Sequence, residues 1–387
     1  MEPKKKYLLL YLKTGGGHLA PAKSISRFFE ENYADEITPV LIDGFEKTNK
    51  IIRYLIEDGY RKLQAKARWF YKALYAVNKI NIFARINSAE VSFFVKPYLT
   101  DVFNEQKPDK IIIFHFFLIE PVYEVIEKMS LKIPVVTVVT DPYIAHPFWF
   151  LNKRQVLVVF SERLKDHCIK KGINKDKIYV FPFILSEKFS RKLPDEKIPD
   201  LKEEYGYDKN KKVILLLGGG DGIPKGMRIL KILFKKLKNV EISIVCGKND
   251  SLLQKASGFN KENGNNILKV YGYVDFIFEL LNISDIVISK CGASTFMEIL
   301  MMRKIPVITN YMWEQEKGNV EFLVRNKLGI YEPDINKLPL VIGELLNHEK
   351  IYDSYRNNIE EIAPKNGAKD VAEFIYYHSS IAEIENL

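Results

Sequence analysis

A histidine follows three consecutive glycines near the start of the chain, in the stretch TGGGHLAPAKSI, which contains Gly15, Gly16, Gly17 and His18. The glycines stand between a continuous apolar run and an amphipathic pattern, which predicts a turn from a buried strand into a helix. Such a turn lets the backbone approach a ligand closely, and it presents helix N-terminal amides to a phosphate or another oxyanion. The glycines leave the role of His18 open.

The same loop has an alternative interpretation as a dinucleotide site. Gly15-x-Gly17-x-x-Ala20 follows the predicted strand, and Asp43 ends the next strand at roughly the distance of the dinucleotide-binding fingerprint. Similar loops occur in other phosphate-binding α/β proteins. A nicotinamide-dependent oxidoreductase therefore remains an alternative at this point.

A second glycine-rich loop occurs in VILLLGGGDGIPKG, in the other half of the chain. It fits neither G-x-G-x-x-G nor the P-loop pattern, because no Gly-Lys-[Ser/Thr] closes it. A tight turn alone would need fewer glycines, so we expect a ligand at this strand end as well. The glycines concerned are Gly218, Gly219, Gly220 and Gly222.

A third loop, in DIVISKCGASTFMEIL, joins a strand that ends at Lys290 to a helix. The amides of Ala293, Ser294 and Thr295 could hold a phosphate at the helix N-terminus. Glu298, one turn later, could accept hydrogen bonds from both hydroxyls of a ribose. Alternatively, Glu298 completes a capping box with Ser294 or Thr295.

Polar side chains also follow two further predicted strands. After PVIT, the helix start in NYMWEQEKGN carries Glu314, Gln315, Glu316 and Asn319, which suit sugar hydroxyls or an ordinary charged helix N-terminus. After TVVT come Asp141, His146 and Trp149. An aspartate beside a histidine can deprotonate a hydroxyl or orient an acceptor, although each residue alone is more often structural.

The elements that must position these loops alternate between strand-like and helical patterns along the whole chain. This alternation predicts an α/β fold with two doubly wound parallel sheets, whose ligands bind at the carboxyl ends of the strands. A polar segment at residues 186–212 is predicted to link a domain of residues 1–187 to one of residues 188–366. The last helix, about 367–387, is predicted to pack back on the first domain. The twelve strand-like runs are YLLLYL, ITPVLID, KIIIFHF, IPVVTVVTD, VLVVFS, KIYVFPF, VILLLGGG, VEISIVCG, NILKVYGYV, DIVISK, PVITN and LGIYEP.

The composition of the 387 residues, 47% apolar and 28% charged, is that of an ordinary globular protein of two domains. Cys168, Cys246 and Cys291 lack metal-ligand spacing and their number is odd, which favours a reducing compartment. The apolar run at the N-terminus is too short for a signal peptide. The other apolar runs are shorter than a membrane span, so we expect a soluble or peripheral protein.

The net charge of +9 suits nucleic acid, an anionic membrane or an anionic small substrate. Basic and aromatic residues are concentrated between Ile51 and Phe103. Such a region can lie on an anionic bilayer, or it can be a solvated face above core aromatics. Its central members are Arg61, Lys66, Arg68, Trp69, Phe70 and Lys72.

Taken together, the motifs resemble the family of monogalactosyldiacylglycerol synthases and processive diacylglycerol glucosyltransferases. The resemblance covers most of the chain, through TGGGHLAPAKSI, TDPYIAHPFWF, LLLGGGDG, VCGKN, VYGYVDFIFELLNISDIVISKCGASTFMEIL and WEQEKGN. The second of these is the most specific match. The chain departs from the family pattern at Glu314, where glycine is usual, and in the turn KCGAST, so the donor sugar stays open.

The resemblance implies a role for each motif. Backbone around Tyr273 and Val274 would contact uracil, and His18 would act as catalytic base or orient the diphosphate, with Asp141 as the second candidate base. The diphosphate would bind Ala293, Ser294 and Thr295, the ribose Glu298, and the hexose Gln315, Glu316 and Asn319, with Gly16, Gly17, Gly219 and Gly220 also in the donor site. The acceptor and membrane surface would comprise His146, Trp149, Arg61, Lys66, Arg68, Trp69, Phe70 and Lys72.

The family is a GT-B one, with two Rossmann-like domains facing across a cleft, and it implies inverting transfer of glucose or galactose from a UDP-hexose to diacylglycerol. The implied partners are UDP-hexose, diacylglycerol and an anionic membrane surface on the cytoplasmic side, without nucleic acid. We expect no cofactor and no metal, because the chain lacks an Asp-x-Asp pair of the kind that holds a cation against a diphosphate. A lipid II-type acceptor, the oxidoreductase and a non-catalytic membrane-binding protein remain alternatives.

Overall fold

The computed structural model describes residues 3–13, 16–48, 81–264 and 268–378. The chain forms two compact units. The first comprises residues 1–186, 313–315 and 366–387, and the second comprises residues 187–312 and 316–365.

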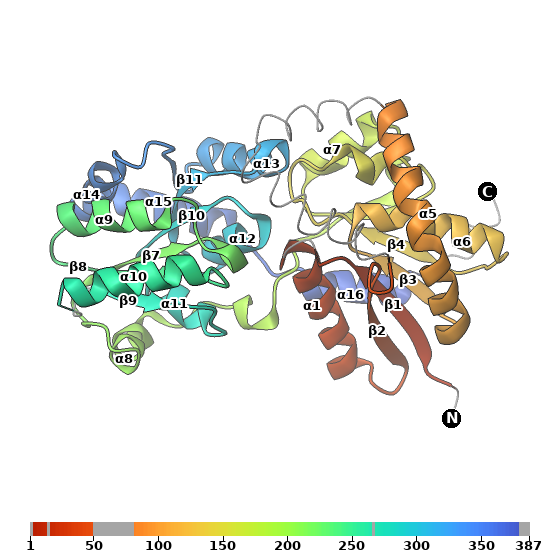
Figure 1. The fold of residues 1–387 in the computed structure, drawn as a ribbon, viewed down its shortest axis with the longest axis horizontal. Helices are drawn as coiled ribbons and strands as arrows, with labels where there is room; N and C mark the ends of the chain where they lie inside the picture. The colour runs from red at the N-terminus through yellow and green to blue at the C-terminus, as the bar shows by residue number, and fades with distance from the viewer. Residues whose placement is uncertain (1–2, 14–15, 49–80, 265–267, 379–387) are drawn as a thin grey trace. The chain divides into compact units, whose positions relative to one another are not determined.

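A six-stranded parallel sheet forms the centre of the first unit, in the order β2-β1-β3-β4-β5-β6 (Figure 1). β2 lies on one side of β1 in the sheet, and β3, the next strand in the chain, lies on the other side of β1. The topological switch point is therefore between β1 and β3. Ligands of doubly wound sheets bind beyond the carboxyl ends of the strands at such a point. The strands are β1 (Lys5–Tyr11), β2 (Ile37–Asp43), β3 (Lys110–Ile113), β4 (Val135–Val138), β5 (Val156–Val159) and β6 (Ile178–Val180).

Helices cover both faces of this sheet, which explains why β1 is apolar at consecutive positions. Tyr7 meets Phe29 of the helix on one face, with ring centroids 5.4 Å apart, whereas Leu8 and Leu10 share a core cluster with Leu99 on the other face. The principal helices are α1 (Gly16–Asn32), α5 (Asn81–Gln106), α6 (Ile119–Lys128), α7 (Glu162–Lys170) and α16 (Ala368–Tyr377).

The C-terminal helix α16 belongs to the first unit and lies beside α1. The rings of Tyr33 and Tyr376 are 4.4 Å apart. The buried Lys110, at the start of β3, donates to the backbone carbonyls of Ile375 and, at 2.8 Å, His378. An ammonium group at the end of a helix satisfies carbonyls that have no intrahelical partner, and it thereby fixes α16 to the sheet.

The second unit has another six-stranded parallel sheet, in the order β12-β11-β10-β7-β8-β9. Counted from β7, this is the Rossmann strand order, with its switch point between β7 and β10. The strands are β7 (Lys212–Leu217), β8 (Val240–Val245), β9 (Leu268–Tyr271), β10 (Ile286–Lys290), β11 (Ile305–Asn310) and β12 (Ile330–Tyr331). The helices are α8 (Ile198–Glu204), α9 (Gly226–Lys236), α10 (Asp250–Glu262), α11 (Ile277–Ile283), α12 (Ala293–Met301), α13 (Trp313–Arg325), α14 (Leu338–Asn347) and α15 (Glu349–Ile362).

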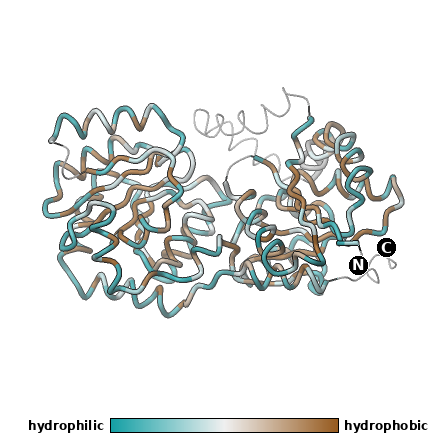
Figure 2. Tube along the Cα trace, turned by 90° about the horizontal axis from the view of Figure 1, so that it is seen from below, coloured by the Kyte–Doolittle hydropathy of each residue, from teal (hydrophilic) through white to brown (hydrophobic). Residues whose placement is uncertain are grey.

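Each of the twelve predicted strands is present. Hydrophobic residues gather along the strands inside each unit (Figure 2). The polar segment predicted as a linker is instead folded, since it contains α8 and the buried Phe189 and Lys202, and almost all of it belongs to the second unit. In the part of the chain that the structure describes, no helix is long and apolar enough to cross a membrane.

Candidate active site

His18 lies in the first turn of α1, at the switch point of the first sheet. Its Nδ1 is 2.8 Å from the backbone oxygen of Phe114, directly after β3, and 2.8 Å from Oγ1 of Thr140, in the loop after β4. A carbonyl oxygen can only accept, so Nδ1 carries the proton. The lone pair of Nε2 is therefore available to take a proton from another group.

The surroundings of His18 keep its ring neutral. The side chain is half-buried, and this desolvation lowers the pKa of His18 to about 4, although the Phe114 carbonyl acts in the opposite direction. At neutral pH the imidazole is consequently uncharged. A neutral ring with a fixed tautomer and an exposed lone pair is the form that a general base requires.

His115 is a second histidine at this site, and sequence reasoning did not single it out. It follows β3, and its ring centroid is 4.3 Å from that of His18. Its Nδ1 accepts the backbone N–H of Phe117 at 3.2 Å, and burial holds the pKa of His115 well below its usual value. The only available signal was its position at the carboxyl end of a predicted central strand.

Asp141 is linked to His18 indirectly, through Thr140 and Trp149. The preceding residue, Thr140, contacts His18, and the carboxylate of Asp141 accepts the indole N–H of Trp149 at 3.0 Å. The Trp149 ring is 6.4 Å from the His18 ring. The first unit therefore brings both predicted catalytic residues to one edge of its sheet.

The burial of Trp149 and His146 corrects one prediction. Trp149 is 0% exposed and His146 is 3% exposed, so neither side chain lies on an exposed membrane-contacting surface, and their contact with the acceptor stays a prediction. His146 instead accepts the backbone N–H of Phe148 at 3.3 Å, capping η3 (Pro147–Phe150), and stacks on Phe116. The two residues fix the loop that carries Thr140 and Asp141.

A cavity of about 160 Å³ lies at the switch point of the second sheet, between the loops that follow β7, β8 and β9 and the start of α12. Six of the predicted donor-binding residues line this cavity, namely Gly219, Gly220, Tyr273, Val274, Thr295 and Glu298. Sequence reasoning missed four other lining residues, which are Leu217, Val245, Gly247 and Ile277.

The glycines of the loop after β7 have two different tasks. A Cβ at Gly218 would lie 2.2 Å from the backbone nitrogen of Ile223, and Gly222 has a φ of +72°, so these two glycines are required by the turn itself. A Cβ at Gly220 would meet no atom within 4 Å. Gly220 therefore keeps the cavity wall open rather than making the turn.

The N-terminus of α12 is shaped for an anion. Its N-cap, Gly292, provides no side-chain hydrogen bond, and Oγ of Ser294 is buried without a partner among the described residues. The first amides of a helix have no intrahelical acceptor. The capping box considered from the sequence is not formed, which leaves these donors for a ligand such as a phosphate.

Glu298 contributes a carboxyl group to the same cavity. Burial raises the pKa of Glu298 to about 7, whereas the charge of Lys188 acts in the opposite direction. A desolvated carboxylate is a strong acceptor for a ligand hydroxyl. Its charge state therefore changes near neutral pH.

The residues predicted to read the hexose occupy α13. Glu316 accepts the backbone N–H of Met312, and burial raises the pKa of Glu316. Asn319 donates to the carbonyl of Cys291 at 2.9 Å, while its buried Oδ1 has no partner in the described chain. Glu316 thus supports the loop from β11 to α13, and Asn319 supports the loop from β10 to α12. Gln315 belongs to the short segment, residues 313–315, that groups with the first unit. Recognition of the hexose by Gln315, Glu316 and Asn319 stays a prediction.

The remaining predicted residues are placed as follows. Gly16 and Gly17 open α1, and a Cβ on either would meet no atom within 4 Å. The predicted membrane residues Arg61, Lys66, Arg68, Trp69, Phe70 and Lys72 lie outside the described residues. On α5, which follows them, Phe93 is 68% and Phe94 43% exposed.

Within the described ranges, no three His, Cys, Asp or Glu side chains are grouped to hold a metal ion.

The fold of the two units is that of GT-B glycosyltransferases. A structure of Anabaena HepE in complex with UDP-glucose aligns with 99% of this chain and 100% of its own, with a TM-score of 0.58 and 15% sequence identity. Likeness at this level establishes the fold.

Sequence comparison then gives the family. Residues 18–182 match the family model for monogalactosyldiacylglycerol (MGDG) synthase, and residues 213–373 match the glycosyltransferase family 28 C-terminal domain. A processive diacylglycerol beta-glucosyltransferase of Bacillus pumilus is 25% identical over 98% of this chain and 97% of its own length. Monogalactosyldiacylglycerol synthase 1 of Arabidopsis thaliana is 26% identical over 88% of this chain but only 64% of its own length.

The chain belongs to the glycosyltransferase family of MGDG synthases and processive diacylglycerol glucosyltransferases, and it is a UDP-sugar-dependent enzyme. The oxidoreductase alternative is thereby set aside. In agreement, Asp43 is already engaged within the protein, because it accepts the backbone N–H of Phe45 and pairs with Lys13 at 3.3 Å.

Proposed function

We propose that this protein transfers glucose or galactose from a UDP-hexose to the hydroxyl group of diacylglycerol, with inversion at the anomeric carbon. The observation that carries the proposal is the hydrogen bond from His18 to Phe114, because it leaves an unprotonated Nε2 on a neutral ring. The acceptor rests on the activities for which the relatives are named, two of which are diacylglycerol glucosyltransferases matched over 97% of their length.

In the proposed reaction, the lipid hydroxyl oxygen attacks the anomeric carbon. The bond from that carbon to the diphosphate oxygen breaks, UDP leaves with the electron pair, and Nε2 of His18 takes the hydroxyl proton. Asp141 is the second candidate for that proton. One displacement inverts the configuration and gives a β-glycoside.

The donor is proposed to occupy the cavity of the second unit. The amides at the N-terminus of α12 and the unpartnered Ser294 hydroxyl would meet the diphosphate, and Glu298 would accept the ribose hydroxyls. The exposed ring of Tyr273 and the backbone of Val274 would lie against uracil. We further propose transfer without a metal, so turnover is expected to continue in excess EDTA.

We also propose that the enzyme works as a peripheral protein on the cytoplasmic face of a membrane. The exposed Phe93 and Phe94 of α5 support this, because they follow the basic, aromatic residues 51–80 in the chain. Aromatic side chains together with Lys and Arg are typical of interfacial segments.

The test is a transfer assay with labelled UDP-glucose or UDP-galactose and vesicles that contain an anionic lipid, with and without diacylglycerol. Label that enters the lipid fraction with one donor, and only when diacylglycerol is present, is the expected result and identifies the sugar. Donor turnover without lipid label would reject diacylglycerol as acceptor, in favour of another lipid. Absence of both turnover and UDP-hexose binding would reject the donor assignment.

A further inference from the structure

A second and larger pocket lies at the opposite edge of the second sheet. It has a volume of about 290 Å³, close to the lower end of the roughly 300–1,000 Å³ that is usual for ligand pockets. Asp285 and Lys304, which line it, directly precede β10 and β11. The pocket therefore opens at the amino ends of strands whose carboxyl ends face the donor cavity.

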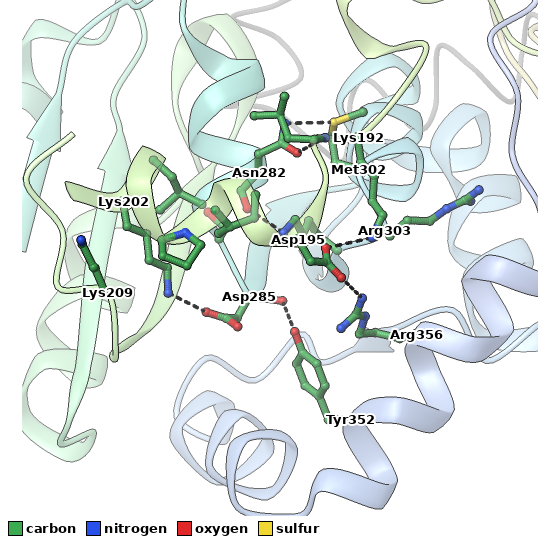
Figure 3. Close-up of a pocket in the computed structure, with 16 residues that line it drawn as sticks. Lys192, Asp195, Lys202, Lys209, Asn282, Asp285, Met302, Arg303, Tyr352 and Arg356 are labelled. Atoms are coloured by element: carbon green, nitrogen blue, oxygen red, sulfur yellow. Dashed lines mark hydrogen bonds and ion pairs between the residues drawn. The ribbon is translucent and has the colours of Figure 1, made fainter. Parts of the chain in front are cut away.

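The lining of this pocket is basic, although Glu203 and Glu360, outside the lining, form ion pairs with Lys209 and Arg303. Six of its side chains are basic and two are acidic, which gives a formal charge of +4 among the lining residues (Figure 3). Ile198, Pro199 and Met302 supply an apolar wall. The basic members are Lys192, Lys202, Lys209, Arg303, Lys304 and Arg356.

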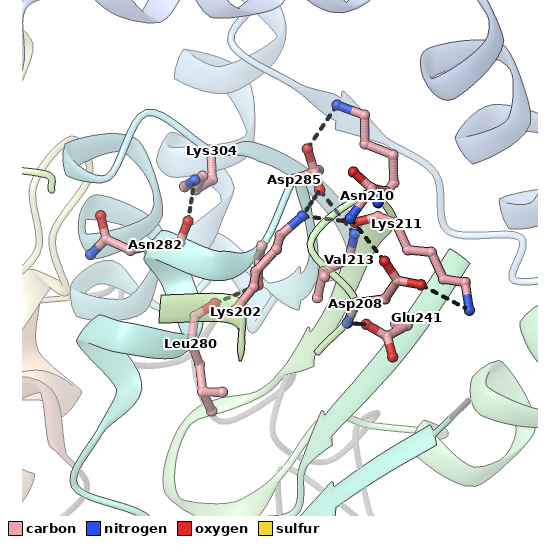
Figure 4. Close-up of polar contacts among 12 residues, drawn as sticks. Lys202, Asp208, Asn210, Lys211, Val213, Glu241, Leu280, Asn282, Asp285 and Lys304 are labelled. Carbon is pink, nitrogen blue, oxygen red and sulfur yellow. Dashed lines mark hydrogen bonds and ion pairs between the residues drawn. The ribbon is translucent and has the colours of Figure 1, made fainter. Parts of the chain in front are cut away.

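Both acidic side chains are already engaged. Asp285 accepts the backbone N–H of Val213 at 2.9 Å and pairs with Lys212 at 3.0 Å (Figure 4). Asp195 pairs with Lys192 at 3.0 Å, and Arg356 is 3.7 Å from its other oxygen. Neither carboxylate makes an ion pair with Lys304.

Lys304 makes no ion pair among the described residues, although the charges of Asp285 and Asp195 lie close enough to favour its ammonium form. Its Nζ donates to the carbonyl of Asn282 at 2.7 Å. Burial lowers the pKa of Lys304 to about 8; Asp285 and Asp195 act against this shift, whereas Arg356 and Lys192 act with it. A desolvated ammonium with unused donors is stabilised by an anion that brings charge and acceptors.

We propose that this pocket binds a phosphomonoester group, held by Lys304, Arg356 and Lys192. A phosphomonoester suits the site because it carries nearly two negative charges at neutral pH and several acceptor oxygens, which Arg and Lys recognise. The apolar wall leaves room for a small carbon skeleton on the phosphate. This site is separate from the donor cavity, so its test does not depend on the transferase reaction.

The test is calorimetric titration of the full-length protein with glycerol 3-phosphate and with inorganic phosphate, at constant ionic strength. Saturable binding is expected for the wild type, weakened about tenfold or more by Arg356→Gln and by Lys304→Met. The matched control is Lys350→Met, because it removes one positive charge from an exposed position on α15, the helix that carries Arg356. The half-exposed Arg356 provides a variant that is expected to fold even if Lys304→Met does not.

A second arm distinguishes the source of the phosphate. Phosphatidylcholine vesicles with and without phosphatidic acid are compared for wild type and Arg356→Gln. Phosphatidic acid-dependent binding that Arg356→Gln weakens would identify a lipid headgroup, whereas loss of only the glycerol 3-phosphate binding would identify a soluble phosphoester. The proposal is overturned if the wild type shows no saturable binding, if Lys350→Met loses as much affinity, or if succinate binds as tightly as glycerol 3-phosphate.

Discussion

His18 has its tautomer set by residues that are far from it in the chain. Phe114 and Thr140 lie 96 and 122 residues away, yet both contact the same ring nitrogen. Nδ1 is held by the protein, so only Nε2 remains for a substrate. This arrangement separates the task of orientation from the task of proton transfer.

Replacement of His18 by Ala is expected to lower kcat by about 10²- to 10⁴-fold, the usual contribution of a general base. Affinity for UDP-hexose should remain close to that of the wild type, since the cavity proposed to hold the donor belongs to the other unit. The two quantities are measured by steady-state kinetics and by calorimetry. His348→Ala, at an exposed histidine of the second unit, is the control. Near-normal turnover of the His18 variant would remove the histidine from the mechanism.

The carboxyl group of Glu298 makes donor binding dependent on pH. Its pKa of about 7 means that it is mostly protonated at pH 6 and mostly ionised at pH 8. Under the proposed function the ionised form would accept from the ribose hydroxyls. Affinity for UDP-glucose should therefore be about tenfold higher at pH 8 than at pH 6, with the loss on acidification centred near pH 7.

Glu298→Gln should bind UDP-glucose with an affinity that varies little over the same range. UDP-glucose is the suitable probe because its diphosphate is esterified at both ends and has no proton that titrates there. Calorimetry at pH 6, 7 and 8 measures the effect. An equal pH dependence in both proteins would assign it to another group.

At the scale of elements, both candidate sites lie at switch points of parallel sheets. The strand orders place β3 beside β1 and β10 beside β7. His115 lies in the loop after β3, whereas His18 and Glu298 lie in the helices that follow β1 and β10. The helices that follow present their N-terminal amides to the same edge. Sheet topology therefore concentrates residues that are scattered along the sequence.

Gly247, in the loop after β8, is expected to be essential for the shape of the donor cavity. Its φ is +60°, and a Cβ would lie 2.4 Å from the backbone oxygen of Gly220. Gly247→Ala should lower the free energy of unfolding by about 1–3 kcal/mol and weaken UDP binding, because the Gly220 loop must move. Urea unfolding and calorimetry measure both effects.

The control for this substitution is Gly258→Ala. Gly258 lies within α10, a Cβ there would meet no atom within 4 Å, and alanine favours a helix over glycine by about 0.5–1 kcal/mol. This variant should be equally or more stable and should bind UDP normally. If Gly247→Ala behaved in the same way, the close approach of the two loops would not matter for the donor site.

At the scale of the whole molecule, charge and exposed aromatic rings predict how the enzyme meets its acceptor. The chain carries a net charge of +9, and Phe93 and Phe94 are exposed on α5. Electrostatic attraction to anionic lipid contributes about 1 kcal/mol per basic residue near the surface and is screened by salt. Insertion of the aromatic rings into the bilayer would add a contribution to the binding free energy that salt does not screen.

Replacing Arg61, Lys66, Arg68 and Lys72 together by Gln is expected to weaken binding to anionic vesicles by a few kcal/mol at 0.1 M salt or below. Vesicle sedimentation at low and high salt measures the loss, and binding of the wild type should also weaken at high salt. The control removes the same charge from four exposed lysines of the second unit, Lys231, Lys235, Lys236 and Lys238. Equal loss in both variants would indicate a general charge effect without a docking segment.

The sequence by itself determined the elements and most of the loops that carry the candidate sites. Continuous apolar runs predicted strands because a parallel sheet is covered by helices on both faces, and glycines beside helix starts marked the phosphate-type loops. These signals are local, so they could be identified without knowledge of the fold.

Only the tertiary structure decided which of these residues meet. It placed His115 against His18, brought Gly247 to the donor cavity, and buried Trp149 and His146, which the sequence suggested for the membrane surface. It also showed the basic pocket, whose members come from four helices and loops. Contacts between distant segments depend on strand order and on the packing of loops at a sheet edge, and no local pattern of residues encodes them.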